Sequence, residues 1–276
     1  MKEKVPVLMT ASVSTRGMKD AYYAAEEREM MYIETLNYYI ETVMSDPNQH
    51  IVFAENSGWN LEHLKAQLNH FDPERLTFIS LDPDLFDISK GKGYNELLMM
   101  NLAIEESEII TRSGGFVKVT GRYPIYNLPY YIKEASDAFE NGKVLYCDVK
   151  DHNIYDFLRL GWTGHSFYSV LYGVKNEYYF HNIGPKYKEL NDYDNRLVEG
   201  MLYQLIVDES KSGRNWWRGE IGDRIIARFK REPVCGGLQG SRMAAWSFSA
   251  DQNNLKSKIK RGIGNGFRII LPWIWF

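Results

Sequence analysis

Residues 5–120 alternate short apolar runs with stretches of helical character, and no other feature constrains the fold as strongly. Each run is long enough for a buried strand, and each intervening stretch is long enough for a helix that returns the chain to the same edge of a sheet. This order indicates an α/β fold with a mainly parallel sheet flanked by helices, whose ligands bind beyond the carboxyl ends of the strands. The expected strands are 5–13, 51–54, 76–81 and 116–120, and the expected helices are 19–44, 61–68 and 94–110.

The second half of the chain is less regular. Apolar runs at 144–148, 166–174 and 178–181 predict further strands, and residues 195–209 predict a helix. There is no internal repeat and no low-complexity segment, and 276 residues suit one large domain with an extension.

The balance of charges and the small number of cysteines exclude several classes of protein. With 33 basic and 36 acidic side chains, the net charge of −3 argues against broad binding to nucleic-acid phosphates. Cys147 and Cys235 lie far apart without metal-ligand spacing, so neither a disulfide framework nor a structural zinc site is expected. The apolar run near the N-terminus is too short for a secretory signal, and no run of about 18 apolar residues predicts a transmembrane helix. We expect a cytoplasmic protein.

The last 21 residues, 256–276, carry five cations and no acid, and they end in a run rich in tryptophan and isoleucine. A basic stretch beside aromatic rings suits peripheral contact with an anionic membrane, on the inner face of the cell membrane. A terminal strand or helix that packs onto the body would produce the same pattern. Gly262, Gly264 and Gly266 argue against a continuous helix here.

A glycine-flanked lysine in Gly91-Lys-Gly-Tyr-Asn-Glu96 begins a predicted helix, and Lys118-Val-Thr-Gly-Arg-Tyr123 follows about 25 residues later. Glycines allow backbone amides to approach a ligand, and the start of a helix favours an anion. The side chains of Lys90, Lys92, Lys118 and Arg122 could neutralise a diphosphate. The same pattern also suits a tight turn in solvent.

These motifs carry a resemblance. Glu55-Asn-Ser-Gly58 after the second strand, Lys90-Gly-Lys-Gly-Tyr-Asn-Glu96, and Lys118-Val-Thr-Gly-Arg-Tyr123 at the fourth strand together resemble bacterial surface-polysaccharide glycosyltransferases of the GT-A type. Leu197-Val-Glu-Gly-Met-Leu-Tyr203 is similar to their Glu-bearing helix on the acceptor side. A glycine-rich segment, Glu232-Pro-Val-Cys-Gly-Gly-Leu-Gln-Gly-Ser241, is similar to one near their C-terminal end. The resemblance covers roughly residues 5–245.

The resemblance implies a GT-A-like, Rossmann-related catalytic domain over residues 1–250, followed by the extension 251–276. Its donor half would be about 1–125 and its acceptor half about 126–250. A nucleotide-sugar donor would lie across the ends of the first strands, with Thr10, Ala11 and Ser12 at the base and ribose. The other donor-binding residues would be Asn56, Ser57, Lys92, Gly93, Glu96, Lys118, Thr120, Arg122 and Tyr123. Tyr123 and Trp162 could also stack on sugar rings.

The sequence departs from this family at the site where a metal is commonly held. Enzymes of this fold commonly carry Asp-x-Asp after the fourth strand, where this chain has Thr120-Gly121-Arg122. A guanidinium can take over part of the charge of a metal and contact phosphate oxygens in bidentate fashion. We therefore assign no metal ligand, although Asp82-Pro-Asp84 and the pair Asp148 and Asp151 keep a Mn²⁺ or Mg²⁺ site open. Asp82 and Asp84 also suit a turn.

An inverting sugar transfer needs a base that takes the proton from the acceptor hydroxyl. Glu199, at the start of the acceptor-side helix, is the first candidate, although an acid in the first turn of a helix is also ordinary dipole complementarity. Asp148, which ends an apolar run, and His165, in a glycine-rich loop, are the second and third candidates.

The sequence thus predicts transfer of a sugar from a nucleotide-sugar donor to a surface-glycan acceptor that is linked to a lipid. One alternative is a metal-independent transferase that uses a CMP-activated sugar. Another, from a different class, is a non-catalytic membrane-associated protein of glycan assembly. No Gly-x-Ser-x-Gly, Walker or His-Glu-x-x-His pattern supports a hydrolase, a P-loop enzyme or a zincin.

Overall fold

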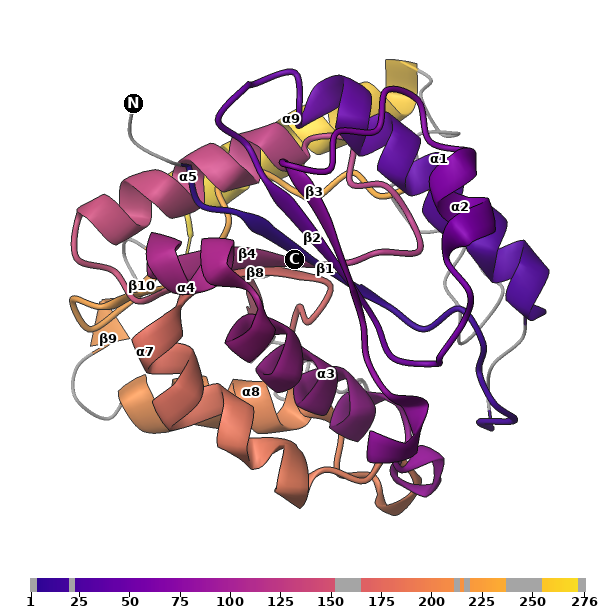
Figure 1. The fold of residues 1–276 in the computed structure, drawn as a ribbon. Coiled ribbons are helices and arrows are strands. Elements are labelled where there is room, and N and C mark those ends of the chain that lie inside the picture. Colours follow the sequence, from indigo (N-terminus) through magenta and orange to yellow (C-terminus); the bar gives the residue numbers. More distant parts are fainter. Residues whose placement is uncertain are drawn as a thin grey trace.

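A nine-stranded sheet forms the centre of the molecule, in the order β3-β2-β1-β4-β8-β5-β11-β10-β9 (Figure 1). The computed structural model describes residues 4–19, 23–151, 165–210, 214–215, 219–236 and 255–272. The strands of the sheet are β1 Val7–Ala11, β2 Ile51–Glu55, β3 Leu76–Ser80, β4 Gly115–Thr120, β5 Leu145–Tyr146, β8 Leu171–Lys175, β9 Arg214–Asn215, β10 Glu220–Ile221 and β11 Ile225–Ile226. A separate hairpin pairs β6 Val149–Asp151 with β7 His165–Phe167.

The sheet is mainly parallel, which confirms the predicted α/β fold. Strands β3, β2, β1 and β4 pair in parallel, and β11 pairs in parallel with β5. Strand β8 is antiparallel to both β4 and β5, so β5 and β11 run in the direction of the first four strands. In this register Thr10 lies beside both Ala54 and Thr120, so β1, β2 and β4 end together at one edge.

Helices cover both faces of the sheet, because two apolar clusters lie on its opposite sides (Figure 1). One face packs against α3 Lys92–Glu106, α4 Glu108–Ser113, α7 Asn176–Tyr178 and α8 Val198–Glu209. The other packs against α1 Ala25–Thr42, α2 Glu62–Ala66 and α5 Leu128–Glu140. Strands β1 and β2 are buried at every position, as expected for central parallel strands with helices on both faces. Short helical turns are η1 Pro83–Leu85, η2 Ile88–Lys90, η3 Tyr179–Ile183, η4 Gly184–Glu189 and η5 Asp192–Asp194.

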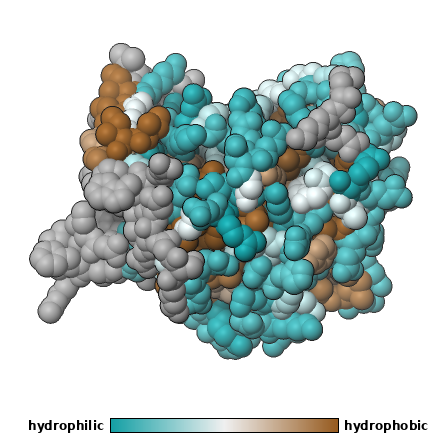
Figure 2. Space-filling view, turned by 90° about the vertical axis from the view of Figure 1, so that its left-hand side faces the viewer, coloured by the Kyte–Doolittle hydropathy of each residue, from teal (hydrophilic) through white to brown (hydrophobic). Residues whose placement is uncertain are grey.

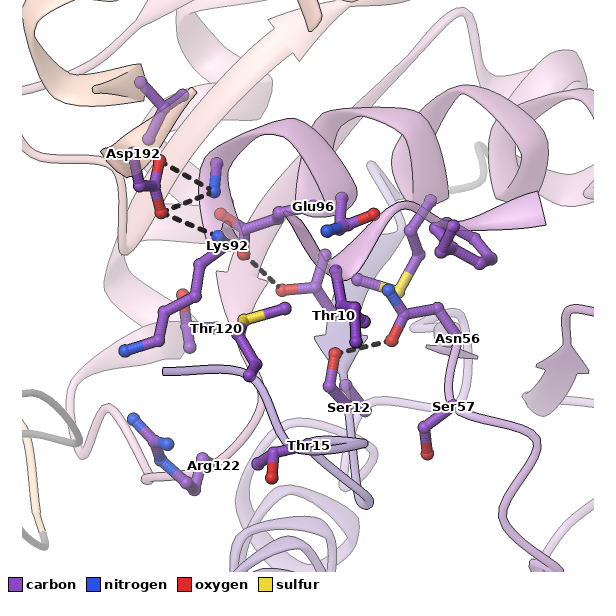
Figure 3. A pocket seen from close by; sticks show the side chains of 18 of the residues that line it. Thr10, Ser12, Thr15, Asn56, Ser57, Lys92, Glu96, Thr120, Arg122 and Asp192 are labelled. Carbon is purple, nitrogen blue, oxygen red and sulfur yellow. Dashed lines mark hydrogen bonds between the residues drawn. The ribbon is translucent and has the colours of Figure 1, made fainter. Parts of the chain in front are cut away.

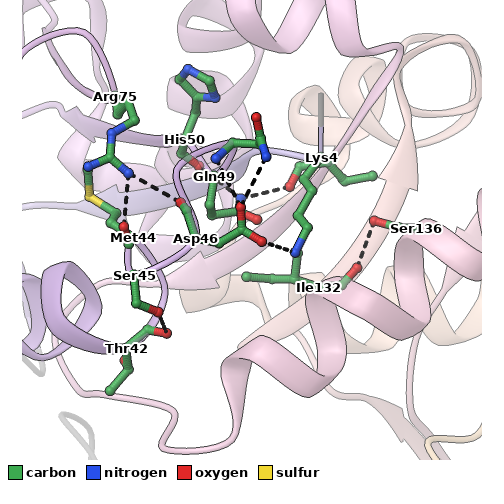
Figure 4. A network of polar contacts seen from close by, with 12 residues as sticks. Lys4, Thr42, Met44, Ser45, Asp46, Gln49, His50, Arg75, Ile132 and Ser136 are labelled. Carbon is green, nitrogen blue, oxygen red and sulfur yellow. Dashed lines mark hydrogen bonds and ion pairs between the residues drawn. The ribbon is translucent and has the colours of Figure 1, made fainter. Parts of the chain in front are cut away.

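At the amino ends of β1 and β2, polar side chains hold the turn after α1 in place (Figure 4). Arg75 donates to the carbonyls of Met44 (2.9 Å) and Asp46 (3.2 Å), and the Asp46 carboxylate pairs with Lys4. Gln49 donates to the carbonyl of Val5 (2.9 Å). These bonds satisfy backbone carbonyls at the edge of the sheet opposite the end that carries the candidate site.

Two predictions from the second half of the chain are corrected by tertiary packing, and one helix was not predicted. The expected strand 178–181 is helical, because Tyr179 and Ile183 are buried four residues apart and Tyr179 packs edge-on against Phe116. The expected strand 166–174 is two strands, β7 and β8. Helix α5 was not predicted, although Pro129 in its first turn is a helix-start signal.

Helix α9, Leu255–Ile270, is continuous, so the expectation that three glycines would interrupt it was wrong. Glycine propensity costs only about 1 kcal/mol per residue, which tertiary contacts can outweigh. Two such contacts are the Asn265 side chain, which accepts from the Glu232 amide (2.9 Å), and Arg268, which bonds Asp148 (3.0 Å). Among the described residues, no helix is both long and apolar enough to cross a bilayer.

Candidate functional site

A cavity of about 770 Å³ opens where β1, β2 and β4 end, between these strand ends and the N-termini of α3 and α8. Figure 3 shows Ser12, Asn56 and Ser57 on one side of it and Lys92 and Arg122 on the other. The lining side chains include five cations, Arg16, Lys19, Arg28, Lys92 and Arg122, and three acids, Glu96, Asp192 and Glu199. A cavity at this position with an excess of positive charge is suited to an anionic ligand.

Glu96, which lines the cavity, forms an ion pair with a buried lysine. Lys118 on β4 is 1% exposed, and its Nζ lies 2.8 Å from Glu96 Oε1 on α3. Thr10 Oγ1 donates to the same carboxylate oxygen (2.8 Å), and Lys118 also donates to Thr120 Oγ1 (3.0 Å). Lys118 therefore neutralises Glu96 from below and does not line the cavity. Glu96 keeps lone pairs that can accept hydroxyl hydrogen bonds from a ligand.

The loops after β1 and β2 are joined by a second polar cluster. Buried Glu55 accepts from the amides of Val13 (3.0 Å) and Ser57 (2.9 Å), one from each loop. Ser12 Oγ donates to Asn56 Oδ1 (2.5 Å) at the cavity wall (Figure 3). Arg28 donates to the carbonyl of Ser12 (2.8 Å), and burial lowers the pKa of this arginine. The bonds from Val13 to Glu55, from Ser12 to Asn56 and from Arg28 to Ser12 join separate segments at the cavity wall.

Arg122 lines the cavity and lies beside aromatic rings in the part of the chain that the structure describes. Its guanidinium carbon lies 5.9 Å from the centre of the Tyr23 ring and 5.8 Å from that of Tyr123. None of the described carboxylates pairs with it, and its Nε is buried without a hydrogen-bond partner. Aromatic faces hold a guanidinium by cation–π attraction and leave its N–H groups free for an oxyanion.

The start of α3 already holds an anion, and this anion belongs to the protein. Asp192 of η5 accepts from the amides of Lys92 (2.6 Å) and Gly93 (3.3 Å), although burial raises the pKa of this carboxyl group (Figure 3). A Cβ at Gly91, where φ is +87°, would lie 2.6 Å from the Asp192 side chain. The absence of a side chain at Gly91 therefore leaves room for Asp192. The first amides of α3, which we expected to face a diphosphate, instead donate to the Asp192 carboxylate.

Replacement of Asp192 by alanine should lower the free energy of unfolding by about 1–2 kcal/mol, because the first amides of α3 lose their acceptor. Urea unfolding measures this difference. Asp194→Ala, in the same turn but exposed, is the control and should leave the unfolding midpoint unchanged. Equal midpoints for the two variants would contradict the capping role.

Glu199, in the first turn of α8, lines the same cavity. Ser169, in the loop between β7 and β8, donates its hydroxyl to Glu199 Oε1 (2.8 Å). No cation among the described residues forms an ion pair with this carboxylate. It is half-buried and oriented by a neutral donor, which leaves its second oxygen able to accept a proton.

The other two candidate bases lie outside the cavity. Asp148 is buried and bonds Arg268 of α9 through both carboxylate oxygens (3.0 Å each). His165 Nδ1 lies 2.7 Å from Asp151 Oδ1 and 3.0 Å from the Tyr203 hydroxyl. Both groups are thus engaged away from the cavity.

The described acids of the cavity are not grouped as the ligands of a divalent metal would be. No group of three His, Cys, Asp or Glu side chains that could hold an ion occurs within the described ranges. A Cβ at Gly121 would lie 2.8 Å from the Met9 side chain, so the backbone after β4 leaves no room there for a ligating side chain. Asp82 accepts from the Asp84 amide (2.9 Å) as the cap of η1, and Asp84 is exposed beside Arg16. The acids that line the cavity are on three different elements: Glu96 on α3, Asp192 on η5 and Glu199 on α8.

Most sequence-predicted residues are brought together at the cavity. Its lining includes Thr10, Ala11, Ser12, Asn56, Ser57, Lys92, Gly93, Glu96, Thr120, Arg122, Tyr123 and Glu199. Lys90 and Lys118 lie outside the lining, and Trp162 lies outside the described residues. Arg16 and Lys19 were missed although they follow β1, where ligand-binding loops are expected. Ser169 and Asp192 carried no local signal, because their partners are 30 and about 100 residues distant.

No protein-family model matches the sequence, and no curated protein matches it. Among solved structures, the chain is similar to the bifunctional glycosyltransferase WbbM, with 11% identity and a TM-score of 0.41, over 75% of this chain and 35% of WbbM. It is similar to the galactosyltransferase LgtC, with 9% identity and a TM-score of 0.41, over 72% of this chain and 69% of LgtC. It is also similar to the mannosyltransferase Ktr4p from S. cerevisiae, with 10% identity and a TM-score of 0.45, over 94% of this chain and 82% of Ktr4p.

The chain spans about a third of the length of WbbM. Similarity at this level of identity and TM-score does not establish an activity. The function of this protein is therefore argued from the residues of the cavity.

Proposed function

We propose that this protein is a glycosyltransferase of the GT-A type that takes a sugar from a nucleotide-sugar donor. The observation that carries the proposal is Arg122, an unneutralised guanidinium held between Tyr23 and Tyr123 at the end of β4. Its N–H groups fit the oxygens of a diphosphate in bidentate geometry. Lys92 and Lys19 line the same cavity and add positive charge.

The nucleoside lies beside β1 and β2. Thr10, Ser12 and Asn56 present hydroxyl and amide groups there, and Glu96 accepts from the ribose hydroxyls. Arg122 is on the opposite side of the cavity (Figure 3). In this proposal the sugar lies beside Glu199, which lines the same cavity.

Transfer proceeds with Glu199 as the base of an inverting displacement. The acceptor hydroxyl oxygen forms a bond with the anomeric carbon while the bond from that carbon to the diphosphate oxygen breaks. The hydroxyl proton passes to Glu199, and Arg122 stabilises the charge that develops on the leaving diphosphate. Ser169 holds the Glu199 carboxylate toward the cavity.

The acceptor in this proposal is a lipid-linked surface glycan, and the protein works at the inner face of the cell membrane. The basic and aromatic segment 256–276 supports this placement.

Arg122→Ala should weaken binding of the nucleotide-sugar donor about 10- to 100-fold, because a charge-assisted contact with the diphosphate is lost. Calorimetric titration against UDP-, GDP-, dTDP- and CMP-sugars, each with Mn²⁺ and with EDTA, measures this affinity. Arg122→Lys should recover only part of it, since an ammonium cannot make the bidentate contact. The matched control is Arg112→Ala, a cation of α4 that does not line the cavity.

Affinity that persists in EDTA supports the role of Arg122 as a substitute for the metal. Affinity that requires Mn²⁺ would contradict it, and no binding by any donor would favour the non-catalytic assembly protein. A CMP-sugar donor is the second candidate, because a single phosphate needs less countercharge than a diphosphate. Selective binding of the CMP-sugar would identify it.

A further inference from the structure

Helix α9 has two unlike faces. Asn265 and Arg268, three residues apart, bond to the body of the protein. Ile259, Ile263, Phe267 and Ile270 follow one another at spacings of three or four residues and so form one stripe. They are 54%, 58%, 41% and 72% exposed, whereas apolar side chains of this size are mostly buried elsewhere in the described chain. Figure 2 shows a largely hydrophilic face on which apolar side chains gather in a patch at the upper left.

A buried ion cluster fastens the inner face of α9. The Arg268 side chain is 12% exposed and donates to both oxygens of Asp148 and to the carbonyl of Phe229 (3.2 Å). Arg228 lies 3.9 Å from the same carboxylate, and burial lowers its pKa to about 10. Burial acts to lower the pKa of Arg268, but Asp148 and Glu232 outweigh it and the pKa is raised. An unpaired guanidinium at this depth would be strongly unfavourable, so the helix is held in one orientation.

We propose that α9 seats the protein on an anionic membrane surface, with the stripe Ile259, Ile263, Phe267 and Ile270 in the acyl boundary and the body fixed above it by Arg268 and Asp148. The helix is too polar to cross a bilayer, but its apolar stripe and flanking cations suit the plane of the interface. This inference deepens the proposed function, since it provides the surface on which a lipid-linked acceptor would be met.

Charge selects a membrane over a second copy of the chain as the partner of this stripe. Apart from Arg268, which Asp148 neutralises, segment 256–276 contains four cations and no acid, so two copies of α9 placed face to face would bring like charges together. Anionic headgroups attract the same cations.

The test is flotation of the whole chain with vesicles of phosphatidylcholine, with and without phosphatidylglycerol. The wild-type protein should float with the anionic vesicles, and less so at high salt. Ile259→Glu with Ile263→Glu should lower the bound fraction by about tenfold or more, since two side chains lose their apolar burial. Met30→Glu, on the exposed side of α1, is the control and should float like the wild type.

Absence of wild-type binding, or equal binding by the stripe variant, would overturn the proposal. So would a dimer in sedimentation that the stripe variant converts to monomer, because the stripe would then pair with itself. Flotation tests membrane binding without a donor, and the calorimetric titration tests donor binding without vesicles. Failure of this inference and failure of the proposed function are therefore distinguishable.

Discussion

Replacement of Glu199 by glutamine is expected to lower the rate of sugar transfer by about 100- to 10,000-fold, the usual contribution of a positioned general base. Glutamine keeps the shape of the side chain and still accepts from Ser169, so the wall of the cavity stays in place. It cannot take a proton. The affinity for the donor should be unchanged, because Glu199 acts on the acceptor hydroxyl.

The measurement is kcat for transfer to a glycan acceptor, together with donor affinity from titration. A fall in kcat at constant affinity identifies a group that acts in the transition state. Asp208→Asn is the matched control, because Asp208 is an exposed acid on the same helix. Full activity in Glu199→Gln would remove this residue from the mechanism.

Replacement of Asp148 by alanine should lower the free energy of unfolding by about 3–5 kcal/mol, the range for breaking one side of a buried ion pair. The change leaves Arg268 and Arg228 buried without their carboxylate, and the Phe229 amide loses an acceptor (3.0 Å). Urea unfolding measures this difference. The midpoint should be lower, because α9 loses the ion pair that joins it to the body.

Asp137→Ala is the control for this prediction. Its carboxylate pairs with Lys133 on the surface of α5, where ion pairs contribute little, so its unfolding midpoint should match the wild type. A stable Asp148→Ala protein that lacks transfer activity would contradict the structural role and restore Asp148 as a candidate base.

The sequence alone predicted the parallel half of the sheet and most of the cavity. Strands β1, β2 and β4 are mostly apolar because helices cover both faces of the sheet, and runs of that kind are visible in the sequence. Parallel strands end at one edge, so the polar residues that follow them meet there. The family resemblance placed Thr10, Asn56 and Arg122 at one donor site, and the structure places all three in the lining of one cavity.

The second half could not be read in the same way, because its strands are short and its packing is non-local. Strands β5 and β11 have only two residues each and are defined by their partners. The aromatic run at 178–181 has an apolar composition typical of a strand, but the burial of Tyr179 and Ile183 requires a helix.

Only the tertiary structure decided the roles of the charged residues. The sequence suggested donor binding for Lys118 and catalysis for Asp148, and it carried no signal for Asp192. In the structure each of the three bonds to a partner distant in the sequence. Arg122 differs, because none of the described carboxylates pairs with it and two aromatic rings lie beside it. Local patterns of hydrophobicity determine which segments become strands and helices, whereas whether a charge is free or neutralised depends on contacts that the chain makes only when it is folded.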